Sequence, residues 1–188
     1  MILHRAHALR TAFLGYPVNE LVSHVDAIKE IVEISQLARV NSAITESIAI
    51  YPLKQGYFTV SSGSEDSNEY SIDIYYKQSK SCSCQDFLYN IDKDKNHMCK
   101  HLWKAHILII LNFLPTVTND LYEWSLAELN KDIEFLQTYP VSQRRQSCVE
   151  QMKIVINQFQ KETSESLNYR KYMILRANIL SQILNVSD

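Results

Sequence analysis

Three of the chain's four cysteines lie close together, and this group constrains the fold more than any other feature. Cys82 and Cys84 are separated by one residue, and Cys99 follows after a longer spacer, with His101 two positions beyond it. Three thiolates and one imidazole are the soft and borderline donors that a tetrahedral Zn²⁺ prefers. We therefore expect these four residues to bind one zinc ion, the first pair from a strand end and the second from the first turn of a helix.

The expected zinc ion is structural. Four protein ligands leave no coordination position open for water or substrate, which argues against metal-dependent hydrolysis at this site. The sequence also lacks a Gly-rich phosphate-binding loop and a G-x-S-x-G motif. We therefore predict that the protein is not an enzyme and has no small-molecule substrate.

Two alternatives to this site stay open. His97 precedes Cys99 by two positions, as His101 follows it by two, so its imidazole is a second candidate for the fourth ligand. Cys82 and Cys84 could also form a redox pair, with Cys99 as the resolving thiol. The fourth cysteine, Cys148, belongs to an apolar helical stripe and is expected in the core.

The composition favours a mostly helical fold. Apolar residues make up 46% of the 188 residues, enough for a packed core without disulfides, and three glycines and four prolines are too few for an all-β fold with many tight turns. Four cysteines do not make a disulfide-dense secreted scaffold, and no apolar run approaches the roughly 20 residues that cross a bilayer. With no apolar signal region at the start, we expect an intracellular protein without membrane contact.

Apolar periodicity divides the chain into three segments. Residues 1–47 are expected to be helical, with one helix over 3–14 and one long or two abutting helices over 18–47. Residues 48–115 contain short β-rich runs at 48–51 and 57–61 and a run with period two at 70–76. The Cys/His group and a buried helix over 102–114 follow. Residues 116–188 carry three helical stripes, with hydroxyls at 163–166 available to cap the last helix. The predicted fold class is α+β, mostly α, with a small antiparallel β-sheet and a helix around one structural zinc, flanked by helices.

The order Cys-x-Cys, spacer, Cys-x-His between a β-hairpin and an apolar helix resembles the SWIM zinc finger. Phe87 stands three residues after Cys84, where that family often has an aromatic residue, and Cys99-Lys-His-Leu fits its C-[KR]-H-aliphatic form. The resemblance covers about residues 57–113 and implies that the four residues above are the metal ligands. It also implies a non-catalytic module that binds DNA or protein, similar to the fingers of Mutator-like transposases and of Shu-complex recombination subunits.

Charge adds a local indication of nucleic-acid contact. The formal charge of −2 excludes a histone-like basic surface. Between positions 77 and 104, however, lysines outnumber acidic residues, and four of them are candidate phosphate contacts: Lys93, Lys95, Lys100 and Lys104. The same lysines could instead form an ordinary solvated loop, and both readings stay open.

The function predicted from these features is a zinc-binding SWIM module that binds DNA, a protein partner or both in a DNA-linked process. The module would be transposase-derived or accessory to recombination and repair. The expected partner is a recombinase-like ATPase or a transposase-related subunit, and the expected location is the nucleus. The alternative is a structural or adaptor subunit of a larger assembly, with no nucleic-acid contact.

Overall fold

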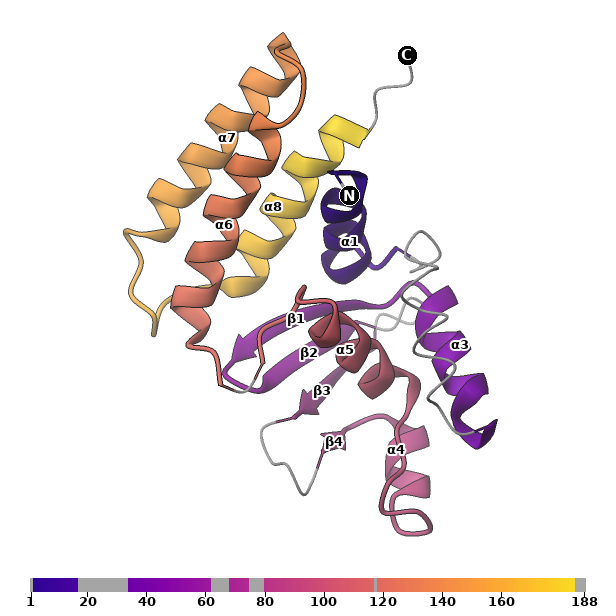
Figure 1. Cartoon of the computed structure of the whole chain (residues 1–188). Helices are drawn as coiled ribbons and strands as arrows, with labels where there is room; N and C mark the ends of the chain where they lie inside the picture. Colours follow the sequence, from indigo (N-terminus) through magenta and orange to yellow (C-terminus); the bar gives the residue numbers. More distant parts are fainter. Residues whose placement is uncertain (1, 17–33, 62–67, 75–79, 117, 185–188) are drawn as a thin grey trace.

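The structure is a computed structural model that describes residues 2–16, 34–61, 68–74, 80–116 and 118–184 (Figure 1). It is α+β and mostly helical, as predicted. The α-helices are α1 (Ile2–Phe13), α3 (Leu37–Thr45), α4 (Gln85–Asn90), α5 (Lys100–Ile110), α6 (Leu121–Gln137), α7 (Gln143–Phe159) and α8 (Tyr169–Leu184), with a short 3-10 turn η2 (Ile34–Gln36) before α3. The strands are β1 (Ala49–Lys54), β2 (Tyr57–Ser61), β3 (Glu69–Asp73) and β4 (Ser81–Cys82).

The four strands form one antiparallel sheet in the order β1-β2-β3-β4, which confirms the predicted small sheet that leads into the cysteine group. β1 runs farther than expected, because it continues through Pro52 to Lys54. Proline lacks an N–H, and a strand at the edge of a sheet tolerates that loss. β4 is short and pairs with β3 through Ile72 opposite Cys82 and Asp73 opposite Ser81.

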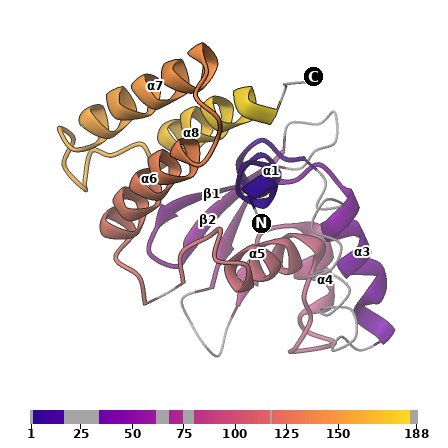
Figure 2. The ribbon, with the colours of Figure 1, turned by 45° about the horizontal axis from the view of Figure 1, so that its top comes forward.

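The helices lie in two groups at the two ends of the sheet (Figures 1 and 2). α6 packs on α7, α7 packs on α8, and α8 in turn contacts α1 and β1. At the other end α3 packs on α5, while α4 and α5 both contact β4. The second group therefore surrounds the cysteines near β4, and the first forms a helical layer beside the β1 edge of the sheet.

The ends of two helices differ from the predictions. α5 stops at Ile110 and not near residue 114, because Asn112 adopts a positive φ of 59° and the Phe113 N–H donates to the Leu108 carbonyl at 2.8 Å. The last helix is not capped by residues 163–166, whose hydroxyls bond within their own turn. Instead the Asn168 side chain accepts from the Lys171 N–H at 3.1 Å. Of the helix expected over 18–47, α3 is present, and residues 18–33 lie outside the described residues.

The main apolar core crosses the three predicted segments. It includes residues of α1, the sheet, α5 and α6–α8, among them the predicted core residue Cys148, which is fully buried. A smaller cluster joins α1, α3 and α5. The division into three segments stays a prediction. Within the described part of the chain, no helix has the length and apolar character that a membrane span needs.

Candidate metal centre

The structure brings the four predicted ligands into one buried group. Cys82 ends β4, Cys84 is the N-cap of α4, Cys99 is the N-cap of α5, and His101 lies in the first turn of α5. Their ligand atoms all lie within 4.8 Å of one another, and the Cys82 Sγ is 3.8 Å from the His101 Nδ1. No side chain in the group is more than 4% exposed.

Backbone hydrogen bonds fix the turn that carries Cys82 and Cys84. The Ser83 N–H donates to the Ser71 carbonyl at 3.0 Å, and the Ser71 N–H donates to the Ser83 Oγ at 2.9 Å. The Cys84 Sγ accepts the Phe87 N–H at 3.4 Å, so the sulfur both starts α4 and faces the group. The two thiols can therefore converge although only one residue separates them.

Electrostatics within the group favour a bound cation. Hydrogen bonds from Cys82 and Cys99 lower the pKa of Cys84, while the hydrogen bond with Cys84 is the main reason that the pKa of Cys82 is raised. Without a metal, the three sulfurs thus stabilise one thiolate at the expense of the others. A dication would compete with those protons and allow all three thiolates to form.

The Nδ1 of His101 is the ring nitrogen that faces the Cys82 sulfur, at 3.8 Å. The His101 Nε2 is buried and has no hydrogen-bond partner among the described residues, and the Tyr70 ring lies 4.8 Å from the imidazole. His97, the alternative ligand, lies outside the group, with its Nε2 3.4 Å from the Asp86 Oδ2. Asp86 also pairs with Arg39 at 3.2 and 3.3 Å. Sequence reasoning missed this Arg39–Asp86 pair, because 47 residues separate the two side chains.

The four candidate DNA-contacting lysines do not form one surface. Lys104 is fully buried, and Lys100 is paired with Glu46. Lys93 lies over the Tyr89 ring at 3.4 Å, and Lys95 forms an exposed pair with Asp92 at 3.4 Å. Burial on α5 removes Lys104 from the surface, so among the described lysines it is not available for contact with a phosphate group.

The fold and the site define a mostly helical α+β protein with a buried Cys₃His cluster. The sequence model of the flt3 ligand family matches residues 77–187, more than half of the chain. The chain therefore belongs to the flt3 ligand family. Comparison with curated proteins gave no match, and comparison with solved structures gave none.

The family match overturns the SWIM interpretation. The matched range contains all four cluster residues and α4–α8, so residues 77–113 of the segment that resembled a SWIM finger are part of the flt3 ligand match. The spacing of the Cys and His residues does not identify a family, because it reflects only how four donors reach one point. Unrelated folds share that requirement.

The functional predictions drawn from that interpretation are wrong as well. A flt3 ligand family member is not a DNA-linked module, a transposase derivative or a recombination accessory. The alternative, a structural or adaptor subunit of a larger assembly, is wrong for the same reason. The expected recombinase-like or transposase-related partner and the expected DNA contact are likewise overturned, as are the intracellular and nuclear locations. The family is one of protein ligands and not of enzymes, in agreement with the expected lack of catalysis at that level.

Proposed function

We propose that this protein acts as a secreted protein ligand that binds a receptor tyrosine kinase and catalyses no reaction. The match of residues 77–187 to the flt3 ligand family is the observation that carries the proposal, because the family is named for a ligand of flt3. That range includes the helical layer of α6, α7 and α8. Stable helices with an exposed outer face offer a rigid surface for a partner protein.

The exposed face of α7 supplies a residue with which to test receptor binding. α7 lies at the edge of the helical layer (Figure 1), and its Ile154 side chain is 56% exposed although it is apolar. Leu53 on β1 is a matched control, because it is similarly apolar and 52% exposed but lies outside the family match. Both positions should tolerate a charged residue without loss of folding.

The experiment measures binding of the purified full chain to immobilised flt3 receptor by a surface biosensor. We expect saturable binding that Ile154→Glu weakens at least several-fold and that Leu53→Glu leaves unchanged. Folding of both variants is checked by circular dichroism. Absence of saturable binding by the wild-type chain would contradict the ligand proposal. An equal loss of receptor affinity in both variants would show that α7 is not the specific contact surface.

We further propose that one structural Zn²⁺ is bound by Cys82, Cys84, Cys99 and His101. Support comes from the four buried donors that converge within 4.8 Å and from the chemistry of three sulfurs and one imidazole. The ion would tie β4 to the first turns of α4 and α5. Because structural zinc contributes about 10–16 kcal/mol of apparent binding free energy in small zinc domains, its loss should unfold this part of the molecule.

Metal analysis of the full chain tests the zinc proposal. We expect one zinc per chain in protein prepared under reducing conditions, and a stoichiometry near zero for Cys99→Ser. Cys148→Ser is the matched control, since Cys148 is equally buried but lies against α8, with its Sγ 3.7 Å from the Ile179 carbonyl. A wild-type chain that contains a Cys82–Cys84 disulfide and no zinc would support the redox pair instead.

A further inference from the structure

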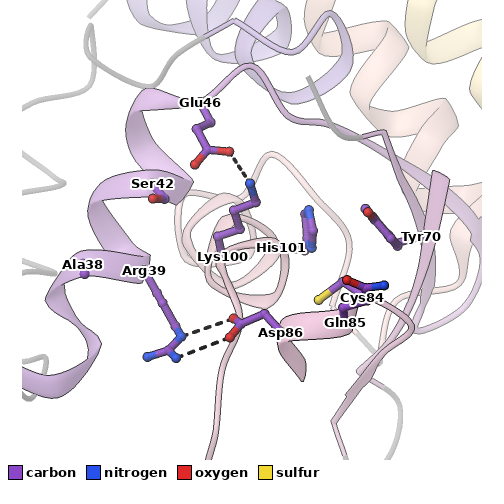
Figure 3. A pocket seen from close by; sticks show the side chains of 10 residues that line it. All are labelled: Ala38, Arg39, Ser42, Glu46, Tyr70, Cys84, Gln85, Asp86, Lys100 and His101. Carbon is purple, nitrogen blue, oxygen red and sulfur yellow. Dashed lines mark hydrogen bonds and ion pairs between the residues drawn. The ribbon is translucent and has the colours of Figure 1, made fainter. Parts of the chain in front are cut away.

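A pocket of about 520 Å³ opens beside the candidate zinc centre (Figure 3). One wall is α3, and the other is formed by the first turns of α4 and α5 together with β3. Two ion pairs span parts of it, Arg39 with Asp86 and Lys100 with Glu46. Charged and polar side chains are among its lining residues, so water and small polar molecules can enter it.

Cys84 is the cysteine of the group that lines this pocket. Its sulfur faces the open space near Asp86 and His101 in Figure 3, and neither Cys82 nor Cys99 is among the lining residues. The exposed fractions agree with this difference, since Cys84 is 4% exposed, Cys82 is 2% exposed and Cys99 is not exposed. A molecule the size of hydrogen peroxide therefore meets the Cys84 sulfur first.

The side chains around the pocket also suit an oxidation in which an anion leaves. Arg39 and Lys100 place two cationic groups on its walls, and each is only part-buried, with exposed fractions of 31% and 35%. Positive charge on the pocket walls favours an anion in the pocket, and Asp86 and Glu46, which pair with these two cations, oppose part of this effect. Metal-bound thiolates retain nucleophilic sulfur, so zinc binding does not by itself prevent the attack.

We propose that Cys84 is an oxidation site, through which a peroxide that enters this pocket releases the zinc ion. The Cys84 thiolate attacks one peroxide oxygen, an S–O bond forms, the O–O bond breaks and hydroxide leaves. Sulfur is oxidised by two electrons to a sulfenic acid, and the peroxide is reduced. A second thiolate of the group, within 4.8 Å, then attacks the sulfenic sulfur, so that a disulfide forms and hydroxide leaves. The remaining thiolate and His101 no longer hold the ion.

This inference rests on the proposed zinc site, and its test separates the two. The zinc-loaded full chain is treated with limiting hydrogen peroxide, released zinc is followed with a chromogenic chelator, and sulfenic acid is trapped with a dimedone-type reagent and located by peptide mass spectrometry. We expect the first trapped sulfenic acid on Cys84, followed by zinc release and a disulfide within the group.

Access through the pocket is tested with a pair of variants on α3. Ser42 lines the pocket, whereas Asn41 is exposed and does not line it. Ser42→Trp should fill the pocket and slow zinc release several-fold, while Asn41→Trp should leave the rate unchanged. Both variants must retain one zinc per chain before oxidation.

Three results would overturn the inference. The first is sulfenic acid that appears first on Cys82 or Cys99, and the second is equal release rates in Ser42→Trp and Asn41→Trp. Either leaves the zinc site standing. A wild-type chain without zinc overturns the zinc proposal and this inference together.

Discussion

Lys104 is a charged residue in unfavourable surroundings. Its side chain is fully buried on α5, and its Nζ has no hydrogen-bond partner among the described residues. Burial lowers the pKa of Lys104 to about 7, and Glu46 opposes part of that shift. An amine in such a place costs stability, because the unfolded chain holds its proton more tightly than the folded chain does.

We expect Lys104→Met to stabilise the protein. The unfolded lysine titrates near pH 10.5 and the folded one near 7, so the wild-type chain should gain stability as pH rises between these values. The variant should be more stable at pH 7 by about 1–3 kcal/mol, since one pKa unit corresponds to about 1.4 kcal/mol and local relaxation recovers part of it. Its stability should also change less with pH over that range.

Denaturant unfolding at several pH values between 7 and 10 measures both effects. Lys153→Met is the matched control, because Lys153 is 53% exposed and forms only a surface pair with Glu150. If Lys104→Met were less stable than the wild type at pH 7, Lys104 would have a buried partner and would not lower the stability of the folded chain.

Among the elements, a buried ionic cluster holds α1, α6 and α8 together. Arg5 on α1 lies 2.7 Å from Asp132 and 3.0 Å from Glu128, both on α6. Arg176 on α8 bonds the same two carboxylates, at 2.8 Å to Glu128, and is fully buried. No sequence pattern predicts this cluster, because its members come from three helices, one of which is far from the others in the chain.

Arg5→Met should loosen α1 from the helical layer. Without Arg5, the two buried carboxylates have only Arg176 and the partly exposed Lys131 to balance their charge. Removing one partner of a buried ion pair costs about 3–5 kcal/mol. Arg5 is 19% exposed, so we expect the lower end of that range. Hydrogen exchange should show faster exchange in α1, while the amides of α3 and α5 keep their protection.

Lys153→Met again serves as the control, because exposed pairs contribute about 0–1 kcal/mol. A change in Arg5→Met no larger than in Lys153→Met would mean that apolar packing alone docks α1. Faster exchange spread evenly over all helices would point to global destabilisation and not to a loosened element.

At the scale of the whole molecule, the same cluster sets how the fold responds to acid. Burial alone would raise the pKa of Glu128, but Arg176 and Arg5 outweigh it and lower the value to about 2. A carboxyl whose pKa is lowered by folding contributes stability above its unfolded value near 4.5. That contribution is lost as pH falls from about 4.5 towards 2.

We expect Glu128→Gln to be less stable than the wild type near pH 7 and to lose less stability between pH 5 and 2. Between pH 5 and 2, the wild type should lose about 2–3 kcal/mol more free energy of unfolding than Glu128→Gln, because of the size of the Glu128 pKa shift. Comparing the two proteins removes the effect of losing the proposed zinc ion in acid, because that loss would be the same in both. Glu150→Gln is the surface control. If the wild type and Glu128→Gln lost the same free energy of unfolding as pH falls from 5 to 2, the prediction would be contradicted.

Several elements could be predicted because their signals are local. The alternation around Ile72 predicted β3, and the stripes beginning at Tyr122 and Cys148 predicted α6 and α7. The ends of helices were predicted less well, because Asn112 and Asn168 act through backbone conformation and a single side-chain bond. The lysines were misjudged for a different reason: composition counts charges but does not say which face of α5 carries Lys104.

The sequence by itself determined the fold class and the donor set of the candidate metal centre. The fold class follows from apolar periodicity, and the donor set follows from the spacing within each of the two ligand pairs. The meeting of the two pairs in one buried group depends on how β4, α4 and α5 pack together. Only the tertiary structure decided that Lys104 is buried and that Arg5 and Arg176 share two carboxylates. It also decided that Cys84, and neither Cys82 nor Cys99, lines the pocket beside α3. Those features arise where segments distant in the chain pack together, and spacing within a segment carries no information about such contacts.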